Sequence, residues 1–415
     1  MKITILGAGS LGVMSAYYLS RSGHEVTVLD RQPEAARECS FANGGQLSYS
    51  HAEPWANPYV FPKVLKWMWQ DDAPLVLRFS LDPHMISWGL RFLWNCRKSA
   101  ADVNSRRLLR LGLHSKAKMH EVMEDTGVPF HHQDKGILHV FSEEKEFEHA
   151  CHQADYQKTL GCEEKVLSWD ECLELEPALK RSTKKIYGGI HAPIDESGDI
   201  RVFTQGLAAY LAEKQNVEFR HNVHIHSLEH DGERITKVVT DQGDITSDAF
   251  VMSLGAYSPL YLRPLGINVP IYPMKGYSVT FPVNDDMPYV SVTDDALKIV
   301  FSRLGDQVRV AGTAEFAGYD SEINQKRIEP ILRGIRTLFP TAEIDNPSLW
   351  ACLRPSTPDG PPIIGKTKLK NLYLNTGHGT LGWTQAAGSA NLLASVINDT
   401  TPEIDMNGMT AARFT

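Results

Sequence analysis

Met1-Lys-Ile-Thr-Ile-Leu-Gly7-Ala-Gly9-Ser10-Leu11-Gly12 opens the chain, and this stretch decides the fold. The apolar, β-branched run over residues 2–6 predicts a buried parallel strand. In the loop that follows, the first glycine permits a tight turn, the second lets the backbone approach a pyrophosphate, and the third lets helix and strand pack closely. A helix over residues 10–22, ended by Gly23, would present free N–H groups to a phosphate.

A second strand, over residues 25–29, runs directly into Asp30. The acid follows the glycines by about 20 residues, where a carboxylate accepts hydrogen bonds from a ribose. A glycine triad alone is weak support for a cofactor site, and an incidental turn is the alternative. Strand, glycines, helix, strand and acid in one unit are typical of a dinucleotide-binding domain. We therefore predict an α/β fold that contains a Rossmann-like domain.

Composition limits the classes of function. The 415 residues, 42% hydrophobic and 22% charged, are typical of a globular protein with two or three domains. A net charge of −8 without a dense basic run argues against nucleic acid as a partner. No apolar run approaches the ~18 residues of a membrane span, and a strand at residue 2 predicts no signal peptide. Six cysteines without Cys-x-x-Cys spacing favour reduced thiols and a cytoplasmic protein.

A metal site is not expected from the histidines. His221, His224, His226 and His230 lie close together in sequence. On a strand, alternation would place only His224 and His226 on one face, and no third ligand has suitable spacing. We predict that they are solvated strand residues.

A loop of small and polar residues, Cys39-Ser-Phe-Ala-Asn-Gly-Gly-Gln-Leu-Ser48, follows Asp30-Arg31. Such a loop allows the backbone to approach a flat ligand closely, although a surface loop without a ligand is the alternative. The order of these motifs resembles the FAD-dependent D-amino acid oxidase superfamily, and most closely its bacterial D-amino acid dehydrogenase branch. The resemblance runs over nearly the whole chain and is strongest at residues 1–50 and 350–390.

The resemblance implies tightly bound FAD, and the second helix that Gly377-His-Gly-Thr-Leu-Gly382 opens would direct a positive N-terminus at the reduced flavin. Cys352 stands where the related sarcosine oxidases attach their flavin, five residues before Thr357-Pro-Asp359. The intervening Arg354 and Pro355 depart from that pattern, so we expect a noncovalent cofactor. The cofactor contacts implied are Gly7, Gly9, Ser10, Leu11, Gly12, Asp30, Arg31, Ser40, Ala42, Asn43, Gly45, Gln46, Leu47, Val223, Gly255, Gly377, His378, Gly379, Thr380, Leu381 and Gly382.

The resemblance also implies oxidation of a D-amino acid to an imino acid, which hydrolyses to a 2-oxo acid and ammonia, with electrons passed to a quinone-type acceptor. Arg354 matches the family position that binds the substrate carboxylate, for which a guanidinium is well suited; a structural salt bridge is its alternative. His51, Lys275, Tyr277 and Lys298 are weaker pocket candidates. A D-proline or hydroxyproline dehydrogenase, an oxidase that uses O₂, and a flavin-carrying subunit of a larger complex remain open.

We expect two interleaved domains. Residues 1–53, 196–262 and 345–415 would form the FAD-binding domain, and residues 54–195 and 263–344 a substrate domain on a mixed or antiparallel sheet. An insertion at residues 54–97 holds five of the eight tryptophans, interspersed with lysines and arginines. Such a segment is either a well-packed insertion or a peripheral contact with the inner face of the cytoplasmic membrane.

Overall fold

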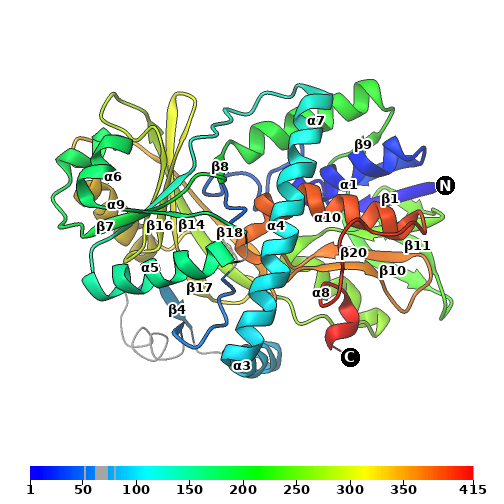
Figure 1. The fold of residues 1–415 in the computed structure, drawn as a ribbon. Coiled ribbons are helices and arrows are strands. Elements are labelled where there is room, and N and C mark those ends of the chain that lie inside the picture. The colour runs from blue at the N-terminus through cyan, green and yellow to red at the C-terminus, as the bar shows by residue number, and fades with distance from the viewer. Residues whose placement is uncertain (51–52, 61–72, 79–80, 160, 415) are drawn as a thin grey trace.

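The structure of the chain is a computed structural model that describes residues 1–50, 53–60, 73–78, 81–159 and 161–414. The candidate residue His51 and residues 61–72 and 79–80 of the tryptophan-rich insertion lie outside these ranges. Two large sheets organise the molecule, one on each side of Figure 1, and the long helix α4 (Lys98–Thr126) crosses in front of the region between them.

The first sheet has six strands in the order β19-β20-β13-β1-β2-β9. All neighbouring pairs are parallel except β19 with β20. The first two strands have the predicted bounds, which confirms the pattern at the start of the chain. The six strands are β1 (Lys2–Leu6), β2 (Glu25–Leu29), β9 (Glu218–Arg220), β13 (Ala249–Met252), β19 (Ile363–Lys366) and β20 (Leu372–Thr376).

Both faces of this sheet are covered. On one face, α1 (Ser10–Arg21), α7 (Ile200–Lys214) and α10 (Gly382–Ile397) share a core with β1, β2 and β13. On the other, a small antiparallel sheet shares a core with Leu6 and Phe250. That small sheet consists of β10 (Ile225–His230), β11 (Ile235–Thr240) and β12 (Gly243–Ile245). The parallel strands are therefore buried on both sides, as their apolar sequences require.

The second large sheet has nine strands and is mixed. Its order is β18-β14-β17-β16-β15-β5-β7-β6, with β4 paired to β17, and the pairs β15–β5 and β17–β4 are parallel. Helix α9 (Gln325–Leu338) packs on it, with α5 (Glu144–Thr159) and α6 (Trp169–Leu175) nearby. The strands are β4 (Leu75–Leu77), β5 (Ile137–Phe141), β6 (Lys165–Leu167), β7 (Gly188–Ala192), β14 (Tyr272–Pro282), β15 (Ser291–Asp294), β16 (Ile299–Leu304), β17 (Gln307–Phe316) and β18 (Ser348–Ser356).

Strand β18 connects the two sheets. It pairs with β14 in the nine-stranded sheet, although the expected domain boundaries assign it to the FAD-binding segment 345–415. Seven residues after its end, the chain enters β19 of the six-stranded sheet. The residues from Arg354 to Thr357 are thereby placed where the two sheets meet. The division into domains stays a prediction.

Three short elements complete the site's surroundings. Strands β3 (Gln46–Leu47) and β8 (Glu196–Ser197) pair with each other. Helix α3 (Pro83–Asn95) precedes α4 and lies at its lower end in Figure 1; the sequence pattern did not predict it. Among the described residues, none of the helices has both the length and the apolar character to cross a membrane.

Candidate active site

A long pocket begins at the glycine-rich turn between β1 and α1 and extends to the junction of the two sheets. Gly7 has φ +108°, and a Cβ on Gly12 would lie 1.8 Å from the Gly7 carbonyl oxygen, so both positions require glycine. At Gly9 the nearest atom to such a Cβ is Ser40 Oγ at 3.7 Å. Gly9 therefore leaves room in front of the helix N-terminus, where a phosphate would lie.

Asp30 lies at the end of β2 and lines the same pocket. Its two carboxylate oxygens accept hydrogen bonds from the backbone N–H groups of Ala8 (2.6 Å) and Gln32 (2.8 Å). Burial raises the pKa of its carboxyl above the ordinary range. Each oxygen retains a second lone pair for a ribose hydroxyl. The neighbouring Arg31 pairs with Glu38 at 2.8 Å.

Unpartnered polar atoms indicate where a cofactor would bind. Among the described residues, Ser253 Oγ, Trp350 Nε1, His378 Nδ1 and Trp383 Nε1 are buried without a hydrogen-bond partner, and all four side chains line the pocket. No side chain caps the N-terminus of α1 or α10. Because buried polar groups are normally satisfied, this set of open donors and acceptors fits a large polar ligand such as a dinucleotide.

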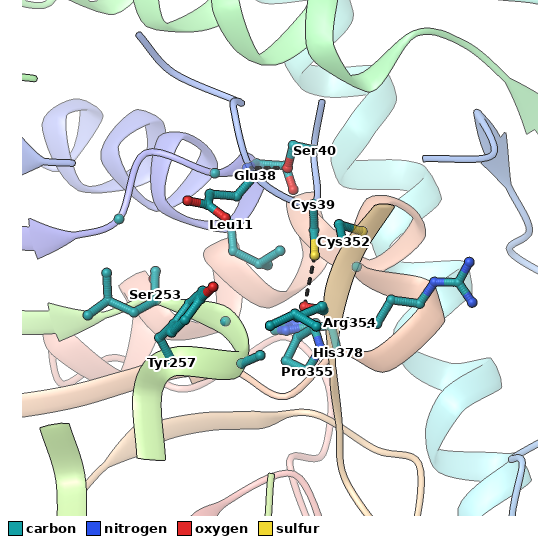
Figure 2. Close-up of a pocket in the computed structure, with 18 of the residues that line it drawn as sticks. Leu11, Glu38, Cys39, Ser40, Ser253, Tyr257, Cys352, Arg354, Pro355 and His378 are labelled. Carbon is teal, nitrogen blue, oxygen red and sulfur yellow. Dashed lines mark hydrogen bonds between the residues drawn. The ribbon is translucent and has the colours of Figure 1, made fainter. Parts of the chain in front are cut away.

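His378 lies between α10 and the pocket. It is 3% exposed, and its Nε2 is 2.9 Å from Ser389 Oγ. Burial lowers the pKa of its imidazole to about 3, so the side chain is neutral at physiological pH. It lines both the long pocket and a neighbouring apolar cavity. Figure 2 shows it beside Arg354 and Pro355.

Arg354 projects from β18 at the far end of the pocket, away from Ser253 and Tyr257 in Figure 2. Its guanidinium lies across the backbone of β14, since a Cβ on Gly276 would be 2.3 Å from Arg354 Cζ. The side chain is half-buried, and no carboxylate within the described ranges lies at ion-pair distance from it. The alternative of a structural salt bridge therefore finds no support in the described part of the chain.

Tyr277, the neighbour of Gly276, belongs to a buried polar network. Its hydroxyl donates to Glu315 Oε2 at 2.5 Å, and burial raises the pKa of its phenol. The candidate Lys275 does not line the pocket: its Nζ lies 2.8 Å from Asp320 and 3.6 Å from Glu315, and Arg78 also pairs with Glu315. These charges neutralise one another. The network thus holds the ring of Tyr277 at the pocket wall, and Arg354 faces the pocket without the carboxylate partner that Arg31, the other arginine of the lining, has in Glu38.

Two cysteines lie in the pocket wall beside Arg354. The thiol of Cys39 donates to the Leu353 carbonyl oxygen at 2.9 Å. Interaction with the neighbouring Cys352 thiol, together with burial, raises the pKa of the Cys39 thiol. Cys352 therefore stands at the cofactor pocket, and whether the cofactor is noncovalent stays a prediction.

The pocket brings together most of the residues singled out from the sequence. The lining includes Gly7, Gly9, Ser10, Leu11, Asp30, Arg31, Ser40, Ala42, Asn43, Val223, Gly255, Tyr277, Arg354, His378, Gly379, Thr380 and Gly382. Six other candidates, Gly12, Gly45, Gln46, Leu47, Gly377 and Leu381, do not line it. Each of them is close in sequence to a residue that lines the pocket. The side-chain amide of Gln46 donates to Ser291 and Thr293, at 3.0 Å each.

The structure does not bring Lys298 to the pocket. It lies exposed in the turn between β15 and β16, where its ammonium pairs with Asp295 at 2.6 Å. It was predicted only as a weaker pocket candidate, and it is absent from the residues that line the pocket. Sequence reasoning missed the lining residues Glu38, Gly276 and Tyr257. They enter the pocket through tertiary packing, for which the local sequence carries no signal.

A group of possible metal ligands lies outside the pocket. His120 and His132 contact Glu196 at 2.7 and 2.9 Å. Lys116 Nζ is 3.1 Å from the same carboxylate, and these contacts hold the pKa of Glu196 down, to about 2, against the effect of its burial. An ammonium beside the ligand oxygen opposes a second cation. We interpret the group as a hydrogen-bonded charge cluster.

Comparison with known proteins agrees with this geometry. Residues 2–396 match the model of the family described as FAD dependent oxidoreductase (DAO). Solved structures share the fold at low identity. Glycine oxidase from Geobacillus kaustophilus has a TM-score of 0.78 at 18% identity, covering 99% of this chain and 98% of that one. L-proline dehydrogenase from P. horikoshii has a TM-score of 0.75 at 18% identity, covering 100% and 97%.

Curated relatives are much more similar in sequence. The D-amino acid dehydrogenase of Paramagnetospirillum magneticum is 49% identical, covering 100% of this chain and 99% of that protein. The D-amino acid dehydrogenase of Dechloromonas aromatica is 46% identical, covering 97% and 98%. Identity at this level over the full length, with a pocket that fits FAD, shows the family. The chain belongs to the FAD-dependent oxidoreductases of the DAO family and, within them, to the D-amino acid dehydrogenases.

Proposed function

We propose that the protein oxidises D-amino acids to 2-oxo acids and ammonia and passes the electrons to a quinone-type acceptor. One observation carries the substrate class: a half-buried guanidinium, that of Arg354, faces the cofactor pocket without a carboxylate partner in the described part of the chain. Two parallel N–H donors bind a carboxylate in a fixed orientation. An amino acid held in this way presents its α carbon to the cofactor.

Bound FAD supplies the redox chemistry, and the residues of the chain supply orientation and electrostatics. Arg354 anchors the carboxylate, and Tyr277, fixed by its bond to Glu315, limits the space beside it. His378 is neutral, and Glu38 is paired with Arg31. Because the His378 imidazole is a poor base and the Glu38 carboxylate is held in an ion pair, we expect the substrate amine to reach the site in its neutral form. We therefore expect kcat/KM to rise with pH until the amine of the substrate is deprotonated.

We propose a lipid-dissolved acceptor because of the surface of α3. Ile86, Leu90, Leu93 and Trp94 are exposed on this helix, with Leu90 65% exposed. Three exposed cations accompany them: Arg91 lies within the helix, and Arg97 and Lys98 follow its end. Exposed apolar side chains beside cations suit a peripheral contact with anionic lipid. The expected division into an FAD-binding and a substrate domain is part of the same proposal.

A panel of D- and L-amino acids with a redox dye tests the substrate class. We expect dye reduction with D-amino acids only. Arg354→Ala should retain FAD and lose about a hundredfold in kcat/KM, corresponding to roughly 3 kcal/mol for a charge-assisted contact. Arg354→Lys, which keeps the charge but not the planar fork, is the matched control and should fall between the two. Near-normal efficiency of Arg354→Ala would contradict the assignment, and peroxide release under air would favour an oxidase.

A further inference from the structure

An apolar cavity of about 370 Å³ adjoins the cofactor pocket. The two share His378, Gly379 and Thr380, so a ligand in the cavity would reach the cofactor pocket at the N-terminus of α10. Such a volume is within the range of small-molecule sites. The cavity has no part in binding the substrate carboxylate, because Arg354 lines only the long pocket.

The cavity walls are mostly aromatic and aliphatic, and the charged side chain in the lining, that of Glu53, is exposed to solvent. Trp88 stacks on Phe92, with ring centroids 5.2 Å apart, and meets Phe316 at 4.9 Å. The indole N–H of Trp88 already donates to the Ser356 carbonyl oxygen at 2.9 Å. Thr357 donates its hydroxyl to the Pro361 carbonyl oxygen at 3.0 Å. With these polar groups satisfied, the walls favour a flat apolar ring over a zwitterion, whose charges would lose their hydration.

The cavity opens at the apolar surface of α3. Ile86, Leu90 and Leu93 line it, yet they are 49%, 65% and 46% exposed. The neighbouring turns of the helix place Met85 and Trp88 on the inner wall. An apolar path therefore runs from exposed side chains of α3 to the backbone at Gly379. In Figure 1, α3 lies at the outer end of α4, with the nine-stranded sheet beside it.

At the inner end, His378 provides a polar atom. Its Nδ1 is buried and without a hydrogen-bond partner among the described residues, and its imidazole is in contact with both spaces. A carbonyl oxygen of a ring that entered the cavity could accept a hydrogen bond from this nitrogen. A ring with carbonyl oxygens and otherwise apolar edges is the chemistry that the cavity would recognise.

We infer that this cavity is the binding site of the electron acceptor, a lipid-dissolved quinone that enters past α3 and stops at His378–Thr380. The inference rests on the proposed function and adds the place at which the acceptor binds. The quinone gains two electrons and two protons and leaves as the quinol. Both electrons and one proton would come from the reduced cofactor, which is oxidised in turn, and the second proton would come from water. Substrate and acceptor would then approach the cofactor through different openings.

Binding is tested on the FAD-loaded protein with a short-chain ubiquinone analogue, which quenches nearby indole fluorescence. We expect saturable quenching, most of which disappears in Trp88→Phe. Leu90→Glu places a charge at the mouth and should raise the Kd at least tenfold. Leu113→Glu is the matched control, because Leu113 is also an exposed helical leucine, at 37%, and lines neither space. Unsaturable quenching that is equal in all variants would overturn the inference.

Electron transfer is tested separately from the amino acid reaction. The flavin is reduced anaerobically with dithionite and mixed with the same quinone, so that no amino acid is required. We expect reoxidation of Leu90→Glu to be about tenfold slower at subsaturating quinone, and reduction by a D-amino acid to be unchanged. If the variant instead slows reduction by apolar D-amino acids and leaves reoxidation unchanged, the cavity holds the substrate side chain. Failure of the proposed function would appear differently, as absence of flavin reduction by any amino acid.

Discussion

At the scale of single residues, the position of Arg354 depends on a neighbour that has no side chain. A methyl group at Gly276 would lie 2.3 Å from the guanidinium carbon. Because the clash is with the end of a flexible side chain, Gly276→Ala should displace Arg354 at little cost in stability. We expect unchanged thermal unfolding and at least a tenfold loss of kcat/KM. In the double variant with Arg354→Ala, the loss should not increase further. Additive losses would show that Gly276 acts on another group.

Cys352 allows a second test at this scale. Its thiol and that of Cys39 lie at the pocket, but the sequence around it departs from the pattern of covalent flavoproteins. We expect acid precipitation to leave the yellow colour in solution. Colour that stays in the pellet, and is lost in Cys352→Ala, would reverse this expectation.

At the scale of elements, two glycines of the β1–α1 turn have different roles: Gly12 allows the backbone to pack closely, and Gly9 leaves room for the cofactor. In Gly12→Ala the new Cβ would meet the Gly7 carbonyl oxygen at 1.8 Å, a backbone clash that must move the helix. We expect a loss of about 1–3 kcal/mol in the free energy of unfolding. Gly9→Ala is its matched control. Gly9 has φ −73° and free space, so the fold should keep its stability while FAD dissociates more readily. Urea unfolding and FAD titration of both variants check this; equal unfolding would contradict it.

The elements also show how much the sequence could predict. Local signals located β1, β2 and the helix between them. Helix α3 was not predicted, although the sequence carries signals for it: Asp82 caps it, Pro83 begins it, and His84, Ser87, Arg91 and Asn95 form a polar stripe at helical spacing. Pairing of β18 with β14 joins residues that are about 75 positions apart in the sequence, and no local pattern specifies such a pairing. The approach of Gly276 to Arg354 follows from that register.

At the scale of the whole molecule, one buried carboxyl makes stability depend on pH. Asp195 is 1% exposed, accepts two hydrogen bonds from Ser50, and has its pKa raised by burial to about 7. In the unfolded chain its pKa is ordinary, near 3.8. At a pH between these two pKa values, Asp195 is therefore protonated in the folded state and ionised in the unfolded state. The stability from this group is complete below pH 4 and is lost as pH rises to 7.

Asp195→Asn removes this titration and keeps the shape of the side chain. Relative to the unsubstituted protein, the variant should gain roughly 3 kcal/mol in the free energy of unfolding between pH 5 and pH 8. Urea unfolding of both proteins across this range is the measurement. A constant difference between them would mean that Asp195 is ionised in the fold throughout.

Attachment to a membrane is the remaining property of the whole molecule. The apolar side chains of α3 would enter the head-group layer, and Arg91, Arg97 and Lys98 would meet anionic lipid. Attraction between exposed charges is screened over about 10 Å at 0.1 M salt, so binding should weaken as salt rises. We expect co-sedimentation with anionic liposomes at low salt, weaker in Arg91→Glu and Lys98→Glu. Lys326→Glu, an exposed lysine on α9, is the control and should bind normally.

The liposomes should also contain a quinone, so that flavin reoxidation is followed on the same sample. If α3 delivers the acceptor site to the lipid, reoxidation should be fastest at low salt, when the protein is bound, and should slow as it dissociates. A protein that stays in the supernatant at low salt, with a reduced flavin that reacts faster with dissolved O₂ than with the quinone, would contradict the proposed contact. The exposed residues of α3 would then serve another contact, and an O₂-using oxidase would become the better interpretation of the same pocket.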